Sequence, residues 1–220
     1  MRSNNFLGQP LLPELVCVRF IDMIAAPAES PAAVEFVAPV VPRPYTYDDL
    51  VAEFQESTQP GELWDGQLVM SPTPSYSHQK IVLRFFRVLD DWVRARQLGE
   101  VVSAPIDMVL SPHLAVQPDV AFIAKERLNI IQRVIMGPVD LAAEVVSLGG
   151  RNRDRIEKRD LYEQHGIKEY WIIDPEPESV DVLHLENGQY QLAQRYGKGG
   201  EAASRLLPGF RAAVDYLFHG

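Results

Sequence analysis

The segment from Asp140 to Gly166 constrains the fold more than any other part of this sequence. Residues 141–146 read LAAEVV, an apolar run with the length of a buried strand, and Glu144 lies in the middle of it. An isolated carboxylate costs several kcal/mol to bury unless it is paired, protonated or bound to a metal. The run therefore predicts a core strand whose acid has a specific partner.

A basic stretch follows this strand. Between residues 151 and 159 five basic residues stand against two acids, a local excess of three in a chain of net charge −9. The basic residues are Arg151, Arg153, Arg155, Lys158 and Arg159, and the acids are Asp154 and Glu157. A helix is predicted over 152–165, ended by Gly166. Its basic face either faces an anionic substrate or is an ordinary solvated surface.

The totals suit an intracellular globular protein. With 220 residues, 46% of them hydrophobic and 23% charged, the chain is long enough for one domain with an appendage. The single cysteine, Cys17, excludes an internal disulfide framework and a cysteine-rich zinc site, and is compatible with the cytoplasm. Charges interrupt the apolar stretch 11–23, and no run reaches the roughly 18–20 apolar residues of a membrane span. We therefore expect a soluble, cytoplasmic protein.

The charge narrows the function classes without fixing one. A net charge of −9 argues against a protein that coats nucleic acid through bulk electrostatics. It is compatible with an enzyme that grips nucleic acid at one local basic surface.

The chain divides by composition near residue 44. Residues 25–44 are rich in alanine, valine and proline, which predicts that residues 1–44 are an N-terminal extension and linker. The alternative is that they add an edge strand or a short helix to the core. Residues 45–220 are predicted to form the folded domain.

Helical and strand-like segments alternate beyond this boundary. Thr46 and Asp49 cap a predicted helix over 45–57, and a second helix is predicted over 78–98 after a loop that ends at Ser77. The dipeptides Asp65-Gly66 and Asn187-Gly188 predict two β-hairpins. Further strands are predicted over 99–110, 115–124, 141–146 and 168–174, with an irregular or helical stretch over 125–137. This order favours an α/β fold, a mixed sheet flanked by helices.

Several acids and one lysine form a candidate catalytic set. Asp119 follows a proline at the start of an apolar strand, as Glu144 lies in another, and two such carboxylates bind a hard cation such as Mg²⁺. Asp154, Lys158 and Tyr162 recur at a spacing of four, which places them on one helix stripe. The ordinary alternatives are a turn residue, an arginine partner and a solvated ion pair. Spacing alone leaves both interpretations open.

An ordered series of motifs resembles the Uma-two family of endonucleases, within the PD-(D/E)XK restriction-endonuclease-like superfamily. The resemblance spans about Tyr45 to Phe218. The motifs are GELWDGQLVMSPTP, SHQKIV, APIDMVL, QPDVAFI, DLAAEVVS, RDRIEKRDLYEQHGIKEYWIIDP and LLPGF. The resemblance implies a restriction-endonuclease-like core, here with an additional C-terminal β-hairpin.

The resemblance also implies roles for individual residues. Asp119 matches the acid of the PD motif and Glu144 the second acid, so both are expected to bind the metal. The superfamily places a lysine two residues after that acid, where this chain has Val146, and in this family Lys158 on the next helix takes the role. The loop 147–150, Ser-Leu-Gly-Gly, departs from the Ser-Pro that is common in the family.

Four further residues are candidates for contact with substrate or with the catalytic set: Glu62, His78, Asp154 and Tyr162. Glu62 and His78 match family positions, although a histidine at a helix start is more often structural. Asp107 is a further candidate for lining the cleft, and the carbonyl of Val145 is a candidate third metal ligand.

The sequence therefore predicts a Mg²⁺-dependent endonuclease, with Mn²⁺ as a substitute and DNA as the expected substrate. A homodimer would supply the two sites needed to cut both strands of a duplex. The main alternative is a non-catalytic nucleic-acid or protein-binding module on the same fold. Glycoside hydrolysis by paired carboxylates ranks below both.

Overall fold

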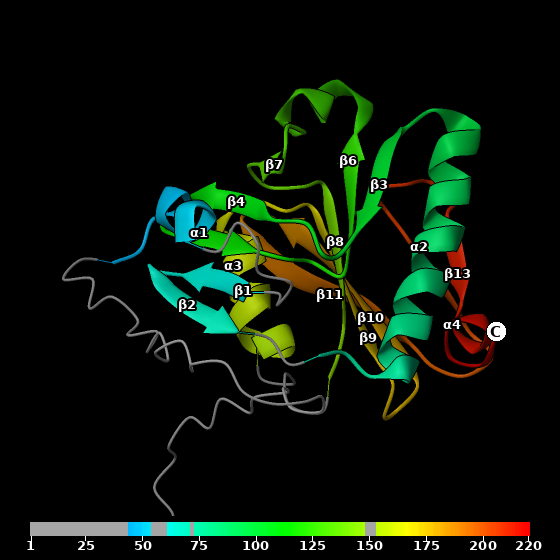
Figure 1. Ribbon diagram of the computed structural model, residues 1–220. Helices are drawn as coiled ribbons and strands as arrows, with labels where there is room; N and C mark the ends of the chain where they lie inside the picture. Colours follow the sequence, from blue (N-terminus) through cyan, green and yellow to red (C-terminus); the bar gives the residue numbers. More distant parts are fainter. Residues whose placement is uncertain (1–43, 54–60, 71–72, 148–152) are drawn as a thin grey trace, which may run out of the picture. The chain divides into compact units, whose positions relative to one another are not determined.

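Three β-sheets and four α-helices make up the described part of the computed structural model (Figure 1). The structure describes residues 44–53, 61–70, 73–147 and 153–220, all within one unit, Val41–Gly220. The predicted extension therefore lies outside the described residues, apart from Pro44.

The largest sheet has six strands in the order β11-β10-β9-β8-β6-β3. All neighbours are antiparallel except β8 and β9, which pair in parallel because a helical crossover, α3, connects them. The strands are β3 (Gly99–Ser103), β6 (Val120–Ala124), β8 (Leu141–Val145), β9 (Glu169–Asp174), β10 (Ser179–Glu186) and β11 (Gln189–Tyr196).

A second sheet of five strands has the order β2-β1-β5-β4-β7, and β12 and β13 form a two-stranded ribbon. These strands are β1 (Gly61–Trp64), β2 (Gln67–Met70), β4 (Met108–Ser111), β5 (Leu114–Val116), β7 (Ile135–Met136), β12 (Glu201–Ala203) and β13 (Arg211–Ala213). The helices are α1 (Tyr47–Glu53), α2 (Tyr76–Arg96), α3 (Lys158–Gln164) and α4 (Val214–His219). A 3₁₀ turn spans Lys125–Ile130, and a π-helical turn, Arg153–Glu157, leads directly into α3.

Both faces of the central strands β6, β8 and β9 are buried, which explains why these strands are mainly apolar. Alternate residues of β8 take opposite sides: Leu141, Ala143 and Val145 pack towards α2 and α4, whereas Ala142 and the following Val146 pack towards α3. The strands of the five-stranded sheet contribute to the same core as α3. Figure 1 shows α2 and α4 together on one side of the large sheet. The sheet therefore separates two cores.

The expected mixed sheet flanked by helices, with an added C-terminal hairpin, is confirmed. Both hairpins form at the predicted dipeptides, and Asp65, Gly66, Asn187 and Gly188 all have positive φ. The predicted cap of α1 also forms, since Thr46 and Asp49 exchange hydrogen bonds between side chain and backbone.

The predicted bounds of one helix and two strand segments are wrong. Helix α2 begins at Tyr76, because Ser75 rather than Ser77 accepts the capping hydrogen bond from the His78 N–H, and it ends at Arg96. The segments 99–110 and 115–124 each contain two strands, one in each sheet. Pro105 and Pro118 explain the breaks, because proline has no N–H to donate to a strand ladder.

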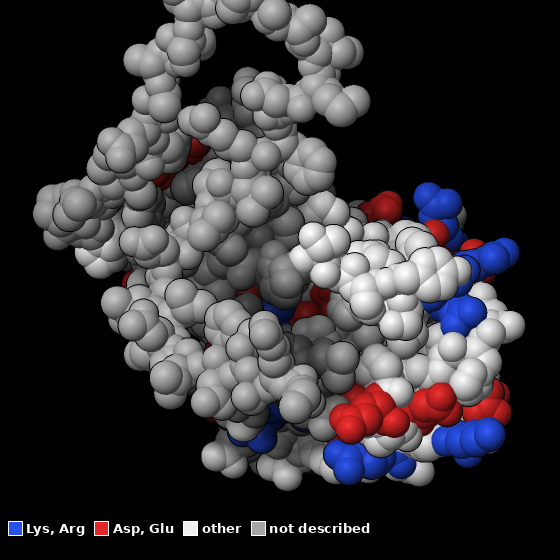
Figure 2. Space-filling view, turned by 60° about the horizontal axis from the view of Figure 1, so that its bottom comes forward, with Lys and Arg blue, Asp and Glu red and all other residues white. Residues whose placement is uncertain are grey.

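Two surface features bear on function. Among the described helices, none has both the length and the apolar character that crossing a membrane requires. On the described part of the face in Figure 2, acidic and basic side chains lie next to one another. The described part of that face therefore carries mixed charge.

Candidate active site

Asp119 directly precedes β6, which pairs with the strand that carries Glu144, β8. The last antiparallel pair is Val120↔Ala143, and extending this register by one residue would bring the two acids opposite each other. Directly opposed residues of an antiparallel pair lie about 4.5–5.5 Å apart at their Cα atoms and share a face of the sheet. Asp119 Oδ2 also accepts a hydrogen bond of 2.8 Å from the backbone N–H of Val145. Two carboxylates therefore lie near the ends of neighbouring core strands.

Lys158 is the first residue of α3, and its side chain turns inward to these strands. Its Nζ lies 2.9 Å from Glu144 Oε1 and 3.0 Å from Glu62 Oε1, and it donates to the Gln117 carbonyl at 3.2 Å. The residue is only 5% exposed. One turn later the Tyr162 hydroxyl donates to Glu144 Oε1 at 2.6 Å. The helix stripe predicted from the spacing thus brings both residues to Glu144.

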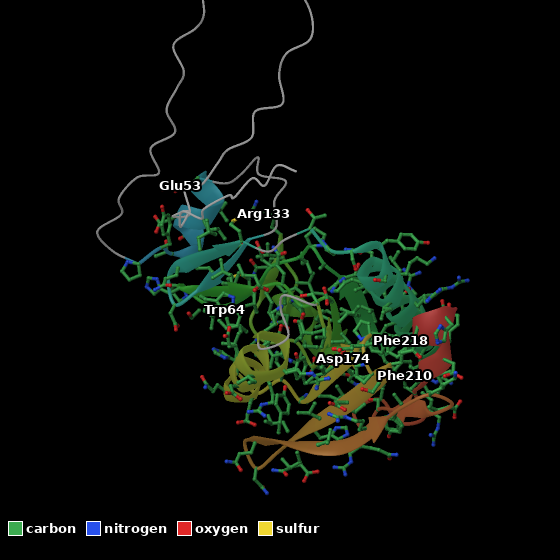
Figure 3. All side chains as sticks on the ribbon, turned by 90° about the horizontal axis from the view of Figure 1, so that it is seen from below. Glu53, Trp64, Arg133, Asp174, Phe210 and Phe218 are labelled. Atoms are coloured by element: carbon green, nitrogen blue, oxygen red, sulfur yellow. The ribbon has the colours of Figure 1, made fainter. Side chains whose placement is uncertain are left out.

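The charge of Lys158 and several hydrogen bonds lower the pKa of Glu62 although this carboxyl group is buried. Burial alone would raise the pKa of its carboxyl group, but the Lys158 ammonium and the hydrogen bonds from Gln117 and Trp64 lower that pKa below its usual value. The Gln117 N–H donates to Oε1 at 2.8 Å, and Trp64 Nε1, labelled in Figure 3, donates to Oε2 at 3.0 Å. Both oxygens of Glu62 thus accept hydrogen bonds. Glu62 therefore positions Lys158 and is not a candidate metal ligand.

The pKa of Tyr162 is shifted in the opposite direction, above its usual value. Complete burial and the negative charge of Glu144 raise the pKa of its phenol well above the usual value, so the hydroxyl stays protonated and remains a donor to Glu144.

His78 lies in the first turn of α2 and faces the other acid. Its Nε2 is 3.3 Å from Asp119 Oδ2. The cap at Ser75 fixes the start of the helix, because its hydroxyl accepts from the His78 N–H. His78 therefore orients Asp119, and the carboxylate is held from two sides.

The described cations of the basic stretch have acidic partners within the protein. Arg155 bonds Asp174 at 2.6 Å and Asp181 at 3.1 Å, and Arg159 bonds Asp160. These cations are paired within the protein, and with Lys158 buried the described part of the stretch presents little free positive charge to a substrate. The side chain of Asp154 and the loop at 148–152 lie outside the described residues.

Sequence reasoning missed Gln117 and Trp64. Gln117 contacts Glu62 and Lys158 through its backbone, and the sequence gives no sign of such contacts. Asp107 was a candidate for lining the cleft. It accepts hydrogen bonds from Gln117 Nε2 and from the Tyr47 hydroxyl, at 2.7 Å each. The only available signal for Gln117 was its position two residues before Asp119.

The donor set fits a hard divalent cation that keeps several waters. Within the described residues, no group of three or more His, Cys, Asp and Glu side chains is placed to hold a metal ion. Asp119 and Glu144 would instead offer oxygen ligands from two neighbouring strands, and Mg²⁺ is commonly bound by one or two carboxylates with water completing its octahedron. The arrangement suits Mg²⁺ or Mn²⁺ and provides no closed protein cage.

A family model described as "Uma2: Putative restriction endonuclease" matches residues 44–215, most of the chain. The chain belongs to the Uma2 family. This Uma2 protein also resembles a solved structure, described as a putative nuclease belonging to DUF820 from Anabaena variabilis, with a TM-score of 0.66 and 17% sequence identity. The match covers 80% of this chain and 98% of that one. No curated protein matches the chain.

These comparisons support a nuclease function in general terms. The family description points to phosphodiester cleavage, and the structural likeness, at 17% identity, shows the shared fold alone. The family match and the acids at the strand ends therefore point to the same class of chemistry.

Proposed function

We propose that residues 45–220 form a Mg²⁺-dependent endonuclease of the PD-(D/E)XK type that hydrolyses phosphodiester bonds of DNA. The observation that carries this proposal is the position of three groups: Asp119 directly before β6, Glu144 on the adjacent strand β8, and the Lys158 ammonium 2.9 Å from Glu144. Two acids near the ends of core strands, with one lysine from the adjoining helix, make up the minimal set for metal-assisted hydrolysis.

The residues divide the work of such a reaction. Asp119 and Glu144 would hold the ion, with the Val145 carbonyl as a further ligand. When bound, Mg²⁺ polarises a phosphoryl oxygen and lowers the pKa of a bound water. Lys158 orients the attacking water or stabilises the charge that grows on the phosphoryl oxygens.

The water oxygen forms the new bond to phosphorus as the bond to the 3′ oxygen breaks, which leaves a 5′-phosphate and a 3′-hydroxyl. His78 and Tyr162 keep the two carboxylates in place during this exchange, through their contacts with Asp119 and Glu144. Neither residue needs to change its protonation state for that task.

Substrate and setting complete the proposal. The family description names restriction endonucleases, which favours DNA over RNA. The mixed charges on the described part of the face in Figure 2 favour contact with DNA at the site itself over binding through bulk charge. A homodimer in the cytoplasm would place two such sites on one duplex.

Titration calorimetry with Mg²⁺ or Mn²⁺ tests the metal arm of the proposal. We expect the wild type to bind and Asp119→Asn and Glu144→Gln to bind far more weakly. Loss of an outer partner of a metal ligand already costs about 10- to 100-fold in affinity, so loss of a ligand is expected to cost at least as much. Glu201→Gln, the same change at an exposed strand residue, is the matched control.

The same titration separates the proposal from the main alternative. A non-catalytic binding module needs no cation at Asp119 and Glu144. Equal metal affinity in the wild type and both variants, with circular dichroism showing all of them folded, would contradict these two residues as ligands. A wild type that binds DNA but no cation, with or without that DNA, would favour the binding module.

A further inference from the structure

The Lys158 ammonium is held by oxygens that come from three separate elements. Glu144 lies on β8, Glu62 lies on β1 of the other sheet, and Gln117 lies in the link between β5 and β6. A lysine side chain has four rotatable bonds and loses much conformational entropy when it is fixed. Its position therefore depends on how firmly each of these three oxygens is itself held.

Gln117 is held through all three of its polar groups. Its N–H donates to Glu62 Oε1 at 2.8 Å, and its carbonyl accepts from Lys158 Nζ at 3.2 Å. Its side-chain amide donates to Asp107 Oδ1 at 2.7 Å. Pro118 follows and restricts the backbone of the preceding residue to extended conformations. One residue thus links the lysine, the acid on β1 and a third carboxylate.

Asp107 is fixed in its turn from α1. The Tyr47 hydroxyl donates to Asp107 Oδ2 at 2.7 Å, on the oxygen that Gln117 does not use. Burial and this hydrogen bond raise the pKa of Tyr47 well above its usual value, so the hydroxyl remains a donor. The result is a continuous chain of hydrogen bonds from α1 through Asp107 and Gln117 to the lysine at the start of α3.

We propose that Gln117 is a positioning residue for Lys158, and that Asp107 and Tyr47 orient Gln117 so that its backbone holds the ammonium between Glu62 and Glu144. The inference rests on the proposed function, in which Lys158 acts on the water or on the reacting phosphate. Gln117 itself need not touch the substrate. Its effect is to keep the ammonium at one point rather than spread over several rotamers.

The first test is kinetic and uses Gln117→Met, which keeps the length of the side chain and removes its amide. We expect kcat for Mg²⁺-dependent cleavage of a duplex oligonucleotide to fall about 10- to 100-fold with KM within about twofold, as for a misplaced catalytic group. Tyr47→Phe removes only the donor to Asp107 and is expected to lower kcat by a smaller factor. Gln191→Met, the same change at an exposed position of β11, is the matched control.

The second test needs no cleavage. Lys158 is buried and bound by carboxylates, so its amine should react slowly with an acylating reagent in the metal-free protein, relative to the exposed Lys198. Gln117→Met is expected to raise the rate at Lys158 several-fold, measured by peptide mass spectrometry, and Gln191→Met is expected to leave it unchanged. Tyr47→Phe is expected to give an acylation rate of Lys158 between those of the wild type and Gln117→Met. It therefore tests the same chain of hydrogen bonds if Gln117→Met folds poorly.

The two measurements separate the outcomes. Faster acylation of Lys158 with a lowered kcat supports the proposal. Faster acylation with a wild type that cleaves no DNA supports the positioning role and counts against the proposed function. Unchanged acylation in folded Gln117→Met and Tyr47→Phe overturns the positioning role, even where the thermal stability or kcat of these variants falls.

Discussion

Lys158→Met is expected to abolish most cleavage and to destabilise the fold at the same time. Methionine fills the apolar part of the site but leaves Glu62 and Glu144, both buried, without the ammonium that lies about 3 Å from each. Removing one partner of a buried ion pair costs about 3–5 kcal/mol in the free energy of unfolding. Loss of a donor aimed at the charge of the transition state costs about 100- to 1,000-fold in kcat.

Two measurements separate these effects. Urea unfolding gives the loss of stability, and cleavage is then measured at a temperature where the variant is fully folded. Lys198→Met, at an exposed position, is the control for the change of residue type and should match the wild type in both. A folded Lys158→Met that cleaves at the wild-type rate would exclude this lysine from the reaction.

Glu169→Gln is expected to give a large loss of stability far from the site. Glu169 is fully buried at the start of β9, and its Oε1 accepts from Trp171 Nε1 at 2.7 Å. Its Oε2 accepts from the backbone N–H groups of Arg205 and Leu206 at 2.9 Å each, and lies 3.0 Å from His184 Nδ1. The amide of glutamine has one acceptor oxygen and one NH₂ group that only donates. In Glu169→Gln the NH₂ group would therefore face N–H donors that have lost their acceptor. We expect about 3–5 kcal/mol of lost stability in urea unfolding.

The stability that Glu169 contributes is also expected to depend on pH. Burial alone would raise the pKa of Glu169, but its hydrogen bonds, led by that from His184, lower it below the usual value of 4.5. A lowered folded-state pKa means that this stabilisation is complete above the usual pKa and is lost as the pH falls through the folded-state value.

We therefore expect wild-type stability to drop in acid, with part of this drop absent in Glu169→Gln. Glu201→Gln makes the same change at an exposed strand residue and should follow the wild type at every pH. Equal stability of Glu169→Gln and the wild type at neutral pH would show that the link between β9 and the 204–206 segment contributes little.

Local structure was the part of the fold most readable from the sequence. The hairpins at Asp65-Gly66 and Asn187-Gly188 form because these dipeptides accept the positive φ that a tight two-residue turn needs. The strand that carries Glu144 was readable because one acid in an apolar run calls for a partner. The spacing of Lys158 and Tyr162 placed both on one helix stripe, and both contact Glu144.

Long-range contacts were out of reach of the same reasoning. The contact of Lys158 with Glu62 joins two elements from different sheets, and no local pattern encodes that packing. The pairing of Arg155 with Asp174 and Asp181 likewise depends on how the β9–β10 hairpin lies against the turn before α3. Local charge counts predicted a basic surface over 151–159, whereas among its described side chains Arg155 and Arg159 are paired with acids of the protein.

The proposed function depends on Asp119 and Glu144 forming a metal-dependent cleavage site. Incubation of supercoiled plasmid DNA with the wild type, Asp119→Asn, Glu144→Gln and Glu201→Gln, each with Mg²⁺ and with a chelator, tests it most directly. We expect the wild type and Glu201→Gln to nick the plasmid with Mg²⁺ and to leave it intact with the chelator. We expect the nicking rate of the two site variants to be at least about 100-fold lower. Full Mg²⁺-dependent cleavage by folded Asp119→Asn and Glu144→Gln would contradict the proposed function.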